Sequence, residues 1–342
     1  MTRGSGLRRA ALMLAVCATL AGVANIASPA HAADNGAWSA SPTQQGTFTA
    51  RQFFFLELAP GATIKDSITI KNAGQVDQPL DIYTADAFNI ESGAGFALRK
   101  RGDKNTDVGS WITLDQEKVV VGPNGGKTIV PFSLTVPRGV TPGDHAGGVV
   151  TIEPAPAPQG DVSQVQIQRA LGVRVYVRVA GPLTPALSIT KVTVSAKPAR
   201  LPFVGQQGGT TVTYTMRNSG NVRLTADREI TLKGLFGRTL RNTGKGPIPE
   251  ILPGSTVTLT ESFPKAPVID QITATVKLTA ADGKVSTSGS ASTFVVSLAF
   301  LILLALLIIG IVLAVWWRRR EAGLVAKMAQ EAGPLTPTGD GI

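Results

Sequence analysis

Short stretches in which apolar and polar residues alternate follow one another through most of the chain. Between Trp38 and Ala291 they include TIKDSITI, KTIVPFSLTV, LGVRVYVRV, TTVTYTM and ITATVKLTA, each bounded by Gly, Pro, Asn or Asp. Successive side chains of a strand point to opposite faces, so this pattern indicates half-buried strands. Helix signals are scarce over the same range. The pattern therefore predicts an all-β protein built from antiparallel sandwiches.

One strand-and-turn pattern occurs twice. SITIKNAG at residues 67–74 returns as TYTMRNSG at 213–220, and in each half a later strand after a Gly/Pro turn ends at a proline, Pro137 or Pro264. The duplication predicts two tandem Ig-like antiparallel β-sandwiches, at about 48–183 and 186–282, joined by GPLTP. Asn tolerates the left-handed region and Gly adopts it freely, so we expect Asn-x-Gly to form a tight left-handed turn.

The N-terminus predicts export. Arg3, Arg8 and Arg9 precede an apolar stretch, and Ala30-His31-Ala32 forms a small-x-small cleavage site, so we expect residues 1–32 to be a signal peptide. Cys17 lies inside the apolar stretch, whereas a lipid-anchored cysteine would follow it.

The C-terminus predicts a membrane anchor. Residues 294–317 carry no charge and are long enough to cross a hydrocarbon core of about 30 Å. Arg318, Arg319 and Arg320 follow directly and predict a cytoplasmic tail, 318–342, by the positive-inside rule. Because VSTSGSAST at 285–293 is small and polar, we expect it to be a flexible stalk. The result is a type I single-pass protein of the cell membrane with an extracellular N-terminal ectodomain.

Composition excludes several classes of function. The chain has 33 Lys and Arg against 23 Asp and Glu, but these charges are interspersed and form no basic stripe, so nucleic acid is not an expected partner. After the signal peptide no cysteine remains and His145 is the one histidine. Thiol chemistry and a Ser-His-acid triad are thereby disfavoured. DKNTD, residues 103–107, resembles the start of a calcium loop but has Val108 where the loop needs glycine. We therefore expect no enzyme activity, no metal and no cofactor.

A family resemblance is carried by four segments in order: LAPGATIKDSITIKNAG, SWITL, VVVGPNGGKTIVPFSLTVPRGVTPGDHAGGVV and LGVRVYVRVAG. Over about residues 48–183 the chain resembles the peptidoglycan-binding domain family associated with WxL surface proteins of Gram-positive bacteria. The resemblance implies an Ig-like sandwich, peptidoglycan binding and assembly with WxL-type surface proteins. Because the chain has no Trp-x-Leu tripeptide, it is expected to be a membrane-anchored companion of such a protein.

Two clusters are candidate ligand-binding sites. In GVRVYVRV the four valines at 173, 175, 177 and 179 share one face, while Arg174, Tyr176 and Arg178 share the other, where a ring between two guanidinium groups suits sugars that bear carboxylates. The alternative is an ordinary outward face with cross-strand ion pairs. Arg99, Lys100 and Arg101 form the densest basic cluster, which is either a contact for wall anions or a solvated loop.

Three further segments leave alternatives open. QFFFLEL, at 52–58, exposes either Phe53 and Phe55 or Phe54 and Leu56. Trp111 is expected in the core, with sugar stacking as the alternative. EPAPAPQG, at 153–160, is expected to be a stiff spacer.

The function predicted from the sequence is a non-enzymatic, membrane-anchored surface protein. It is expected to bind peptidoglycan or an anionic wall polymer, WxL-type protein partners, or both. The alternative is a structural or assembly subunit that pairs its strands with other proteins and contacts no glycan.

Overall fold

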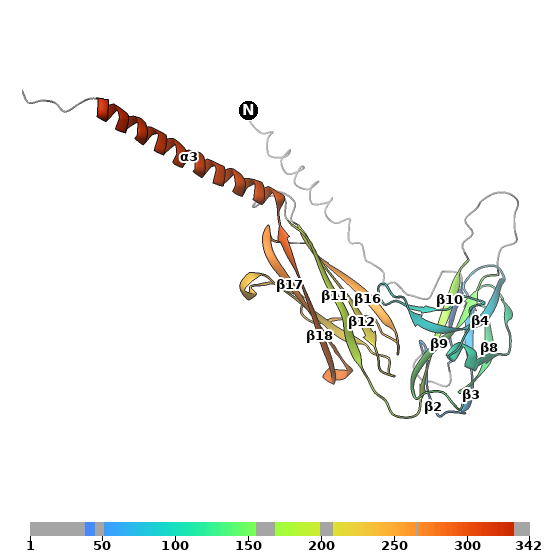
Figure 1. The fold of residues 1–342 in the computed structure, drawn as a ribbon. Coiled ribbons are helices and arrows are strands. Elements are labelled where there is room, and N and C mark those ends of the chain that lie inside the picture. The colour runs from blue at the N-terminus through green and yellow to red at the C-terminus, as the bar shows by residue number, and fades with distance from the viewer. Residues whose placement is uncertain (1–37, 45–50, 155–167, 199–207, 265, 332–342) are drawn as a thin grey trace, which may run out of the picture.

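The computed structural model describes residues 38–44, 51–154, 168–198, 208–264 and 266–331 (Figure 1). The predicted signal peptide, the end of the predicted tail and most of the proline-rich segment lie outside the described residues.

Strands β1–β10 form two sheets that enclose one core. Apolar side chains of both sheets meet there, among them Trp38, Phe54, Ile68 and Phe132, and Trp111 is buried with them as expected. The first sheet has the order β1-β3-β8-β6 and the second β2-β10-β9-β4-β5, with β7 beside β4. The elements are β1 (Trp38–Pro42), β2 (Phe54–Leu58), β3 (Thr63–Asn72), β4 (Gln78–Asn89), β5 (Phe96–Leu98), α2 (Val108–Trp111), β6 (Ile112–Leu114), β7 (Lys118–Val121), β8 (Lys127–Thr135), β9 (Gly143–Ile152) and β10 (Ala170–Val179).

Pairing in this sandwich is antiparallel with one exception. The edge strand β2 runs parallel to β10, although the sequence pattern predicted only antiparallel pairs. Strand β1 begins at Trp38 and pairs with β3. The sandwich therefore begins before residue 48, the boundary expected from the sequence.

Strands β11–β18 enclose a second core, which includes Tyr214, Met216, Ile230 and Val276. One sheet has the order β11-β12-β16 and the other β14-β13-β17-β18, with β15 beside β13. The elements are β11 (Leu187–Lys197), β12 (Gly209–Asn218), β13 (Ala226–Lys233), η1 (Leu235–Gly237), β14 (Thr239–Asn242), β15 (Gly246–Pro247), β16 (Thr256–Phe263), β17 (Ile269–Ala280), η2 (Ala281–Gly283) and β18 (Val285–Val296).

The expectation of a flexible stalk at 285–293 is wrong. This segment belongs to β18, which pairs with β17 over its whole length, from Val285 opposite Ala280 to Val296 opposite Ile269. Small polar residues suggested a linker, but half-buried and exposed positions alternate along them as in any edge strand. Close packing explains the glycine at position 289, because a Cβ there would lie 2.9 Å from side-chain atoms of β11.

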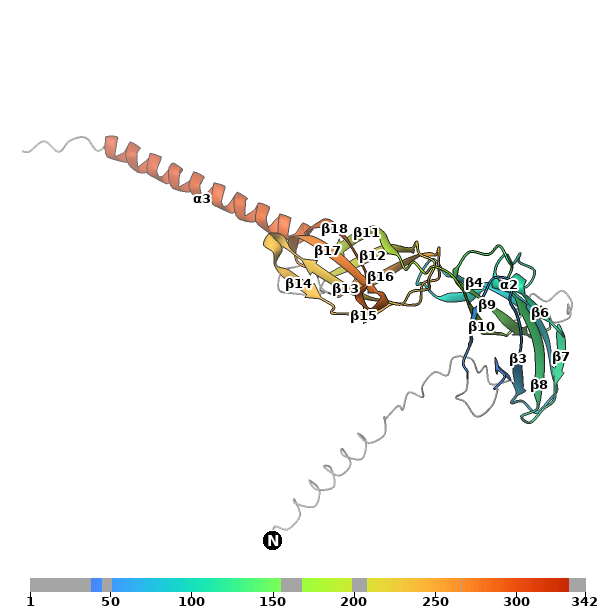
Figure 2. The same ribbon diagram turned by 90° about the horizontal axis from the view of Figure 1, so that it is seen from below.

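A long helix, α3 (Leu298–Glu331), follows β18 and projects away from the sandwiches (Figure 2). It begins four residues after the expected start at 294, because residues 294–296 complete β18. Within the segment Leu298–Leu324 an 18-residue window has a mean hydropathy of 3.4, and the helix is long and apolar enough to cross a membrane.

The repeated Asn-x-Gly turns do not use left-handed backbone. Asn72, Gly74, Asn218 and Gly220 all lack a positive φ. Each buried Asn instead donates two hydrogen bonds to main-chain carbonyls and accepts one from the N–H of the following Gly. Glycine is needed for close approach, since a Cβ on Gly220 would lie 2.3 Å from the carbonyl oxygen of Thr184. The accepting carbonyls belong to Val76 and Val121 in the first turn and to Val222 and Ile251 in the second.

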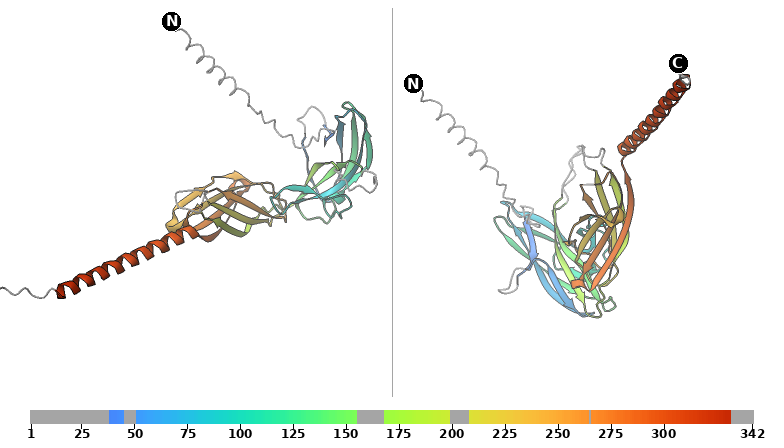
Figure 3. Two further views of the ribbon diagram at one scale, coloured as in Figure 1. Left: turned by 90° about the horizontal axis from the view of Figure 1, so that it is seen from above. Right: turned by 90° about the vertical axis from the view of Figure 1, so that its left-hand side faces the viewer.

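The two sandwiches meet at an angle (Figures 1 and 3) and are tied by hydrogen bonds. The Asn89 amide donates to the carbonyl of Glu250 and accepts from the N–H of Leu252. On the other side of the joint the Asp144 N–H donates a hydrogen bond to the main-chain carbonyl of Asn221. The tip of the β4–β5 hairpin places Ala94 in the core of the second sandwich. Each of these bonds satisfies at least one main-chain group, and together they make the joint an ordered interface.

Candidate functional site

The strand β10 shows the alternation that the sequence predicted. Its four valines lie in the first core, and Arg174, Tyr176 and Arg178 lie on the opposite face. That face is not open to solvent along its whole length, because the second sandwich covers part of it.

Of the three residues on this face, Tyr176 is the one that the second sandwich covers most completely. It is 2% exposed and packs with Ala146 and with Leu252 of the second sandwich. The Arg223 guanidinium lies 4.2 Å from its ring centroid. Burial and the nearby Glu250 charge raise the pKa of Tyr176. The expectation that this ring offers a free stacking face for a sugar is therefore wrong, because the domain joint occupies it.

Arg178 is held in the same joint. Its Nε and Nη2 atoms donate to the two carboxylate oxygens of Asp144 at 2.7 and 3.0 Å, and Asp144 also accepts from the main-chain N–H of Arg223. The hydrogen bond to Asp144 raises the pKa of Arg178. Here the alternative reading, an outward face with cross-strand ion pairs, describes what the structure contains.

Arg174 differs from these two residues. It is exposed, and its guanidinium carbon lies 4.3 Å from the ring centroid of Phe96 on β5. Both residues line a surface groove of about 310 Å³ together with Tyr83 of β4 and Leu98 of β5.

Two glycines let β5 lie over the sheet at this groove. A Cβ on Gly148 would be 2.7 Å, and one on Gly172 2.6 Å, from a methyl carbon of Leu98. The groove therefore depends on the absence of a side chain at one position of β9 and at one position of β10.

The basic loop borders the same face of the sandwich. Arg101 pairs with Asp81 of β4 at 2.5 Å, and Arg99 and Lys100 are exposed. Tyr83 lies between the groove and a second hollow of about 360 Å³ that Arg101 lines. Burial raises the pKa of Tyr83, and the Arg101 charge opposes this effect. The structure thus brings Arg174 and Arg101, which are far apart in the sequence, to neighbouring hollows that share Tyr83.

The three consecutive phenylalanines follow the first of their two readings. Phe54 is buried against Phe132, and Phe53 and Phe55 are about two-fifths exposed on the outer face. The Phe53 ring meets Tyr176 edge-on at 5.5 Å, and Arg178 lies 5.4 Å from the Phe55 ring. Phe53 and Phe55 thus contact the buried residues of the joint on one side and solvent on the other.

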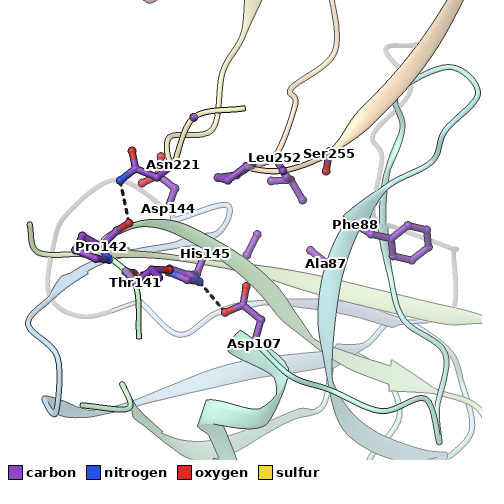
Figure 4. Close-up of a pocket in the computed structure, with 14 residues that line it drawn as sticks. Ala87, Phe88, Asp107, Thr141, Pro142, Asp144, His145, Asn221, Leu252 and Ser255 are labelled. Atoms are coloured by element: carbon purple, nitrogen blue, oxygen red, sulfur yellow. Dashed lines mark hydrogen bonds and ion pairs between the residues drawn. The ribbon is translucent and has the colours of Figure 1, made fainter. Parts of the chain in front are cut away.

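A separate cleft of about 390 Å³ lies between the sandwiches and contains His145 (Figure 4). Its Nδ1 is 2.8 Å from the Asp107 carboxylate and its Nε2 is 2.9 Å from the carbonyl oxygen of Thr141. Neither partner can donate, so both ring nitrogens must, and this arrangement favours imidazolium. Burial lowers the pKa of His145, but these hydrogen bonds and the Asp107 charge outweigh it and raise the pKa above its usual value.

Sequence reasoning missed Tyr83 and Phe96. The alternation of β4 places Leu80 and Ile82 in the core and Tyr83 on the opposite face, so the sequence held a signal for that residue. It held none for Phe96, whose position depends on how β5 crosses the sheet.

Comparison with known proteins gives weak similarities. No family model and no curated protein matches the chain, so the resemblance to the peptidoglycan-binding family stays a prediction. Among solved structures, the class 5 fimbriae chaperone CfaA is 10% identical, covers 76% of this chain and 100% of its own, and has a TM-score of 0.34.

Two further structures have comparable scores. In the CsuC–CsuE chaperone–tip adhesion subunit pre-assembly complex of Acinetobacter baumannii, the matched chain is 13% identical over 60% of this chain and 85% of its own, with a TM-score of 0.31. The PapD-like domain 7 of human CEP192 is 12% identical over 41% of this chain and 95% of its own, with a TM-score of 0.24. At TM-scores below 0.5 none of these similarities assigns a function.

Proposed function

We propose that this protein is a membrane-anchored cell-surface binding protein, without enzyme activity, that holds peptidoglycan or another anionic wall polymer on the outer face of its first sandwich. The observation that supports this proposal best is the groove that Arg174, stacked on Phe96, lines together with Tyr83. Aromatic rings pack against the apolar faces of sugars, and guanidinium groups pair with carboxylates in fixed geometry.

The basic loop adds to this surface. Arg99 and Lys100 are exposed, and Arg101 lines the neighbouring hollow. A polymer that carries sugars and carboxylates can contact rings in the groove and cations at its border at the same time. The family resemblance of residues 48–183 points to the same ligand class, with WxL-type proteins as partners.

The C-terminal helix supports the anchoring part of the proposal. Residues 298–317 are uncharged, and Arg318, Arg319 and Arg320 follow them. With the expected signal peptide, the positive-inside rule places the sandwiches outside the cell and the C-terminus in the cytoplasm.

The test is co-sedimentation of the ectodomain, residues 33–297, with isolated peptidoglycan at low and high salt. Arg174→Glu and Tyr83→Ala should reduce pelleting. Arg217→Glu changes the same charge on an exposed position of the second sandwich and should leave pelleting unchanged. Arg178 is a poor choice for this test, because its loss also breaks the pair with Asp144. Equal pelleting of Arg174→Glu and Arg217→Glu would contradict the proposal.

A second candidate function rests on the edge strands. β1, β2 and β18 each end a sheet in the described part of the chain, and sheet edges can accept a strand from a partner. An assembly subunit of this kind would capture a protein from the cell envelope and would not pellet with purified wall under any salt condition.

A further inference from the structure

Large apolar side chains are exposed at the end of the second sandwich from which α3 leaves. They come from three separate segments: Leu235 and Phe236 in η1, Ile269 at the start of β17, and Phe294 and Val296 at the end of β18. Phe236 is fully exposed and Phe294 is 75% exposed. Isolated exposed apolar residues are ordinary, but five that gather at one end of a domain require a reason.

Strand register shows that these segments meet at one level of the sandwich. Ile269 is opposite Val296, and Asp270 is opposite Val295. The Asp270 carboxylate accepts hydrogen bonds from the Leu235 N–H and from the Arg238 guanidinium, both at 2.7 Å. The η1 turn is therefore fastened to the strand end that precedes α3.

Phe236 is held in an unusual conformation. Its φ of 58° and ψ of 24° are left-handed, which is unfavourable for residues other than glycine. A bulky apolar residue kept both strained and fully exposed indicates that the exposed ring has a use outside the fold.

No linker separates this end from the helix. Ser297 alone lies between β18 and α3; it is 2% exposed, and its N–H donates to the carbonyl of Val268. Figures 1 and 2 show α3 starting directly at the end of the sandwich. At about 1.5 Å per residue, the 20 residues from Leu298 to Trp317 span about 30 Å, so the hydrocarbon boundary falls close to Leu298. Phe294 precedes Leu298 by four residues, so at about 3.3 Å each its backbone lies at most about 13 Å from that boundary, and its large exposed ring is close enough to reach the headgroup layer.

Charge and shape at this end fit the same surroundings. The stretch 230–249, which contains η1, has four cations and no acid. Lys233 and Arg238 are exposed beside η1, and Arg238 also pairs with Asp270 through Nη2. The end is also hollowed by a pocket of about 430 Å³, lined by Leu232, Leu240 and Phe263 among others.

We propose that this end of the second sandwich is a membrane-contacting surface. Phe236 and Phe294 insert into the interfacial layer of the outer leaflet beside α3, and Lys233 and Arg238 contact the phosphates of anionic headgroups. The partner is the lipid bilayer, because the helix that crosses it begins at this surface. Two contact points fix the angle of the two-domain arm to the membrane. This inference rests on the membrane anchoring proposed above and is independent of wall binding.

The experiment uses the full chain in vesicles of phosphatidylcholine with and without phosphatidylglycerol. In a Cys17→Ala background, single cysteines replace Phe236, Val120 or Leu306 and carry an environment-sensitive fluorophore. Val120 is an exposed apolar position on the first sandwich and is the matched control; Leu306 lies within α3 and reports anchoring. Nitroxide-labelled lipids then quench the fluorophore according to its depth.

Headgroup-level nitroxides should quench the label at 236 several-fold more than the label at 120, and acyl-chain nitroxides should quench the label at 306. Anionic lipid should increase the quenching at 236, and Lys233→Glu should reduce that increase. Quenching at 236 no stronger than at 120, with 306 quenched, would overturn membrane contact and leave the anchor intact. Absence of quenching at 306 would overturn the anchor and this inference with it.

Discussion

Replacing Asn72 or Asn218 with alanine should destabilise one sandwich at a time. The two residues occupy matching turns, are 1% and 0% exposed, and each makes three side-chain hydrogen bonds with main-chain groups. Alanine removes all three bonds and fills none of the space.

The magnitude follows from the bond count. A hydrogen bond contributes about 0.5–1.5 kcal/mol net, so three lost bonds lower the free energy of unfolding of that sandwich by about 2–4 kcal/mol. With a urea dependence of about 2 kcal/mol per molar, the midpoint of the affected sandwich should fall by about 1–2 M.

Urea unfolding of the ectodomain, residues 33–297, separates the two sandwiches by probe. Trp38 and Trp111 are its only tryptophans and both lie in the first core, whereas far-ultraviolet circular dichroism reports both sandwiches. Asn72→Ala should lower the midpoint of the fluorescence transition. Asn218→Ala should lower the midpoint of the part of the circular dichroism transition that fluorescence does not report.

A third Asn-x-Gly turn provides the control. Asn242 accepts a hydrogen bond from Gly244 as the other two do, but it is exposed and Gly244 has a φ of 67°. Asn242→Ala should change stability by less than about 0.5 kcal/mol. If replacing either buried Asn lowered the free energy of unfolding no more than Asn242→Ala does, the stabilising role that we ascribe to the three hydrogen bonds of each side chain would be refuted.

Three further predictions concern single features. An ectodomain ending at residue 284 lacks β18 and should fail to unfold cooperatively in calorimetry, whereas one ending at 297 should show cooperative transitions. Equal behaviour of the two would mean that β18 contributes nothing to the stability of the second sandwich. Because the folded pKa of His145 is raised, its stabilising contribution is fully present below its unfolded pKa of about 6.5 and is lost as pH rises through the folded value. Asp107→Asn should flatten this pH dependence of the melting temperature, and an unchanged slope would exclude the pair as its source. The Tyr214 hydroxyl is buried without a hydrogen-bond partner among the described residues, and burial raises the pKa of Tyr214 to about 12. Tyr214→Phe should therefore be neutral or stabilising by up to about 1 kcal/mol in urea unfolding, and a clear loss would mean that the hydroxyl is satisfied in solution.

The sequence by itself determined the features that depend on neighbouring residues. The period-two alternation of β10 places its four valines in the core, because side-chain direction in a strand depends only on position parity. The length and composition of α3 are equally local properties. The duplicated Asn-x-Gly turn was visible too. Its predicted left-handed backbone was wrong, because the Asn side chains are there to bind main-chain carbonyls that lie outside the motif.

Only the tertiary structure decided what covers each face. Alternation indicates that Tyr176 points away from the core, yet the second sandwich reaches it through Arg223 and Leu252. The Ser-rich residues of β18 look like a linker until β17 supplies their hydrogen bonds. Arg174 and Arg101 border neighbouring hollows only because β5 crosses the sheet over two glycines. These outcomes arise from register and packing between residues distant in the chain, and no local pattern of residues encodes such contacts.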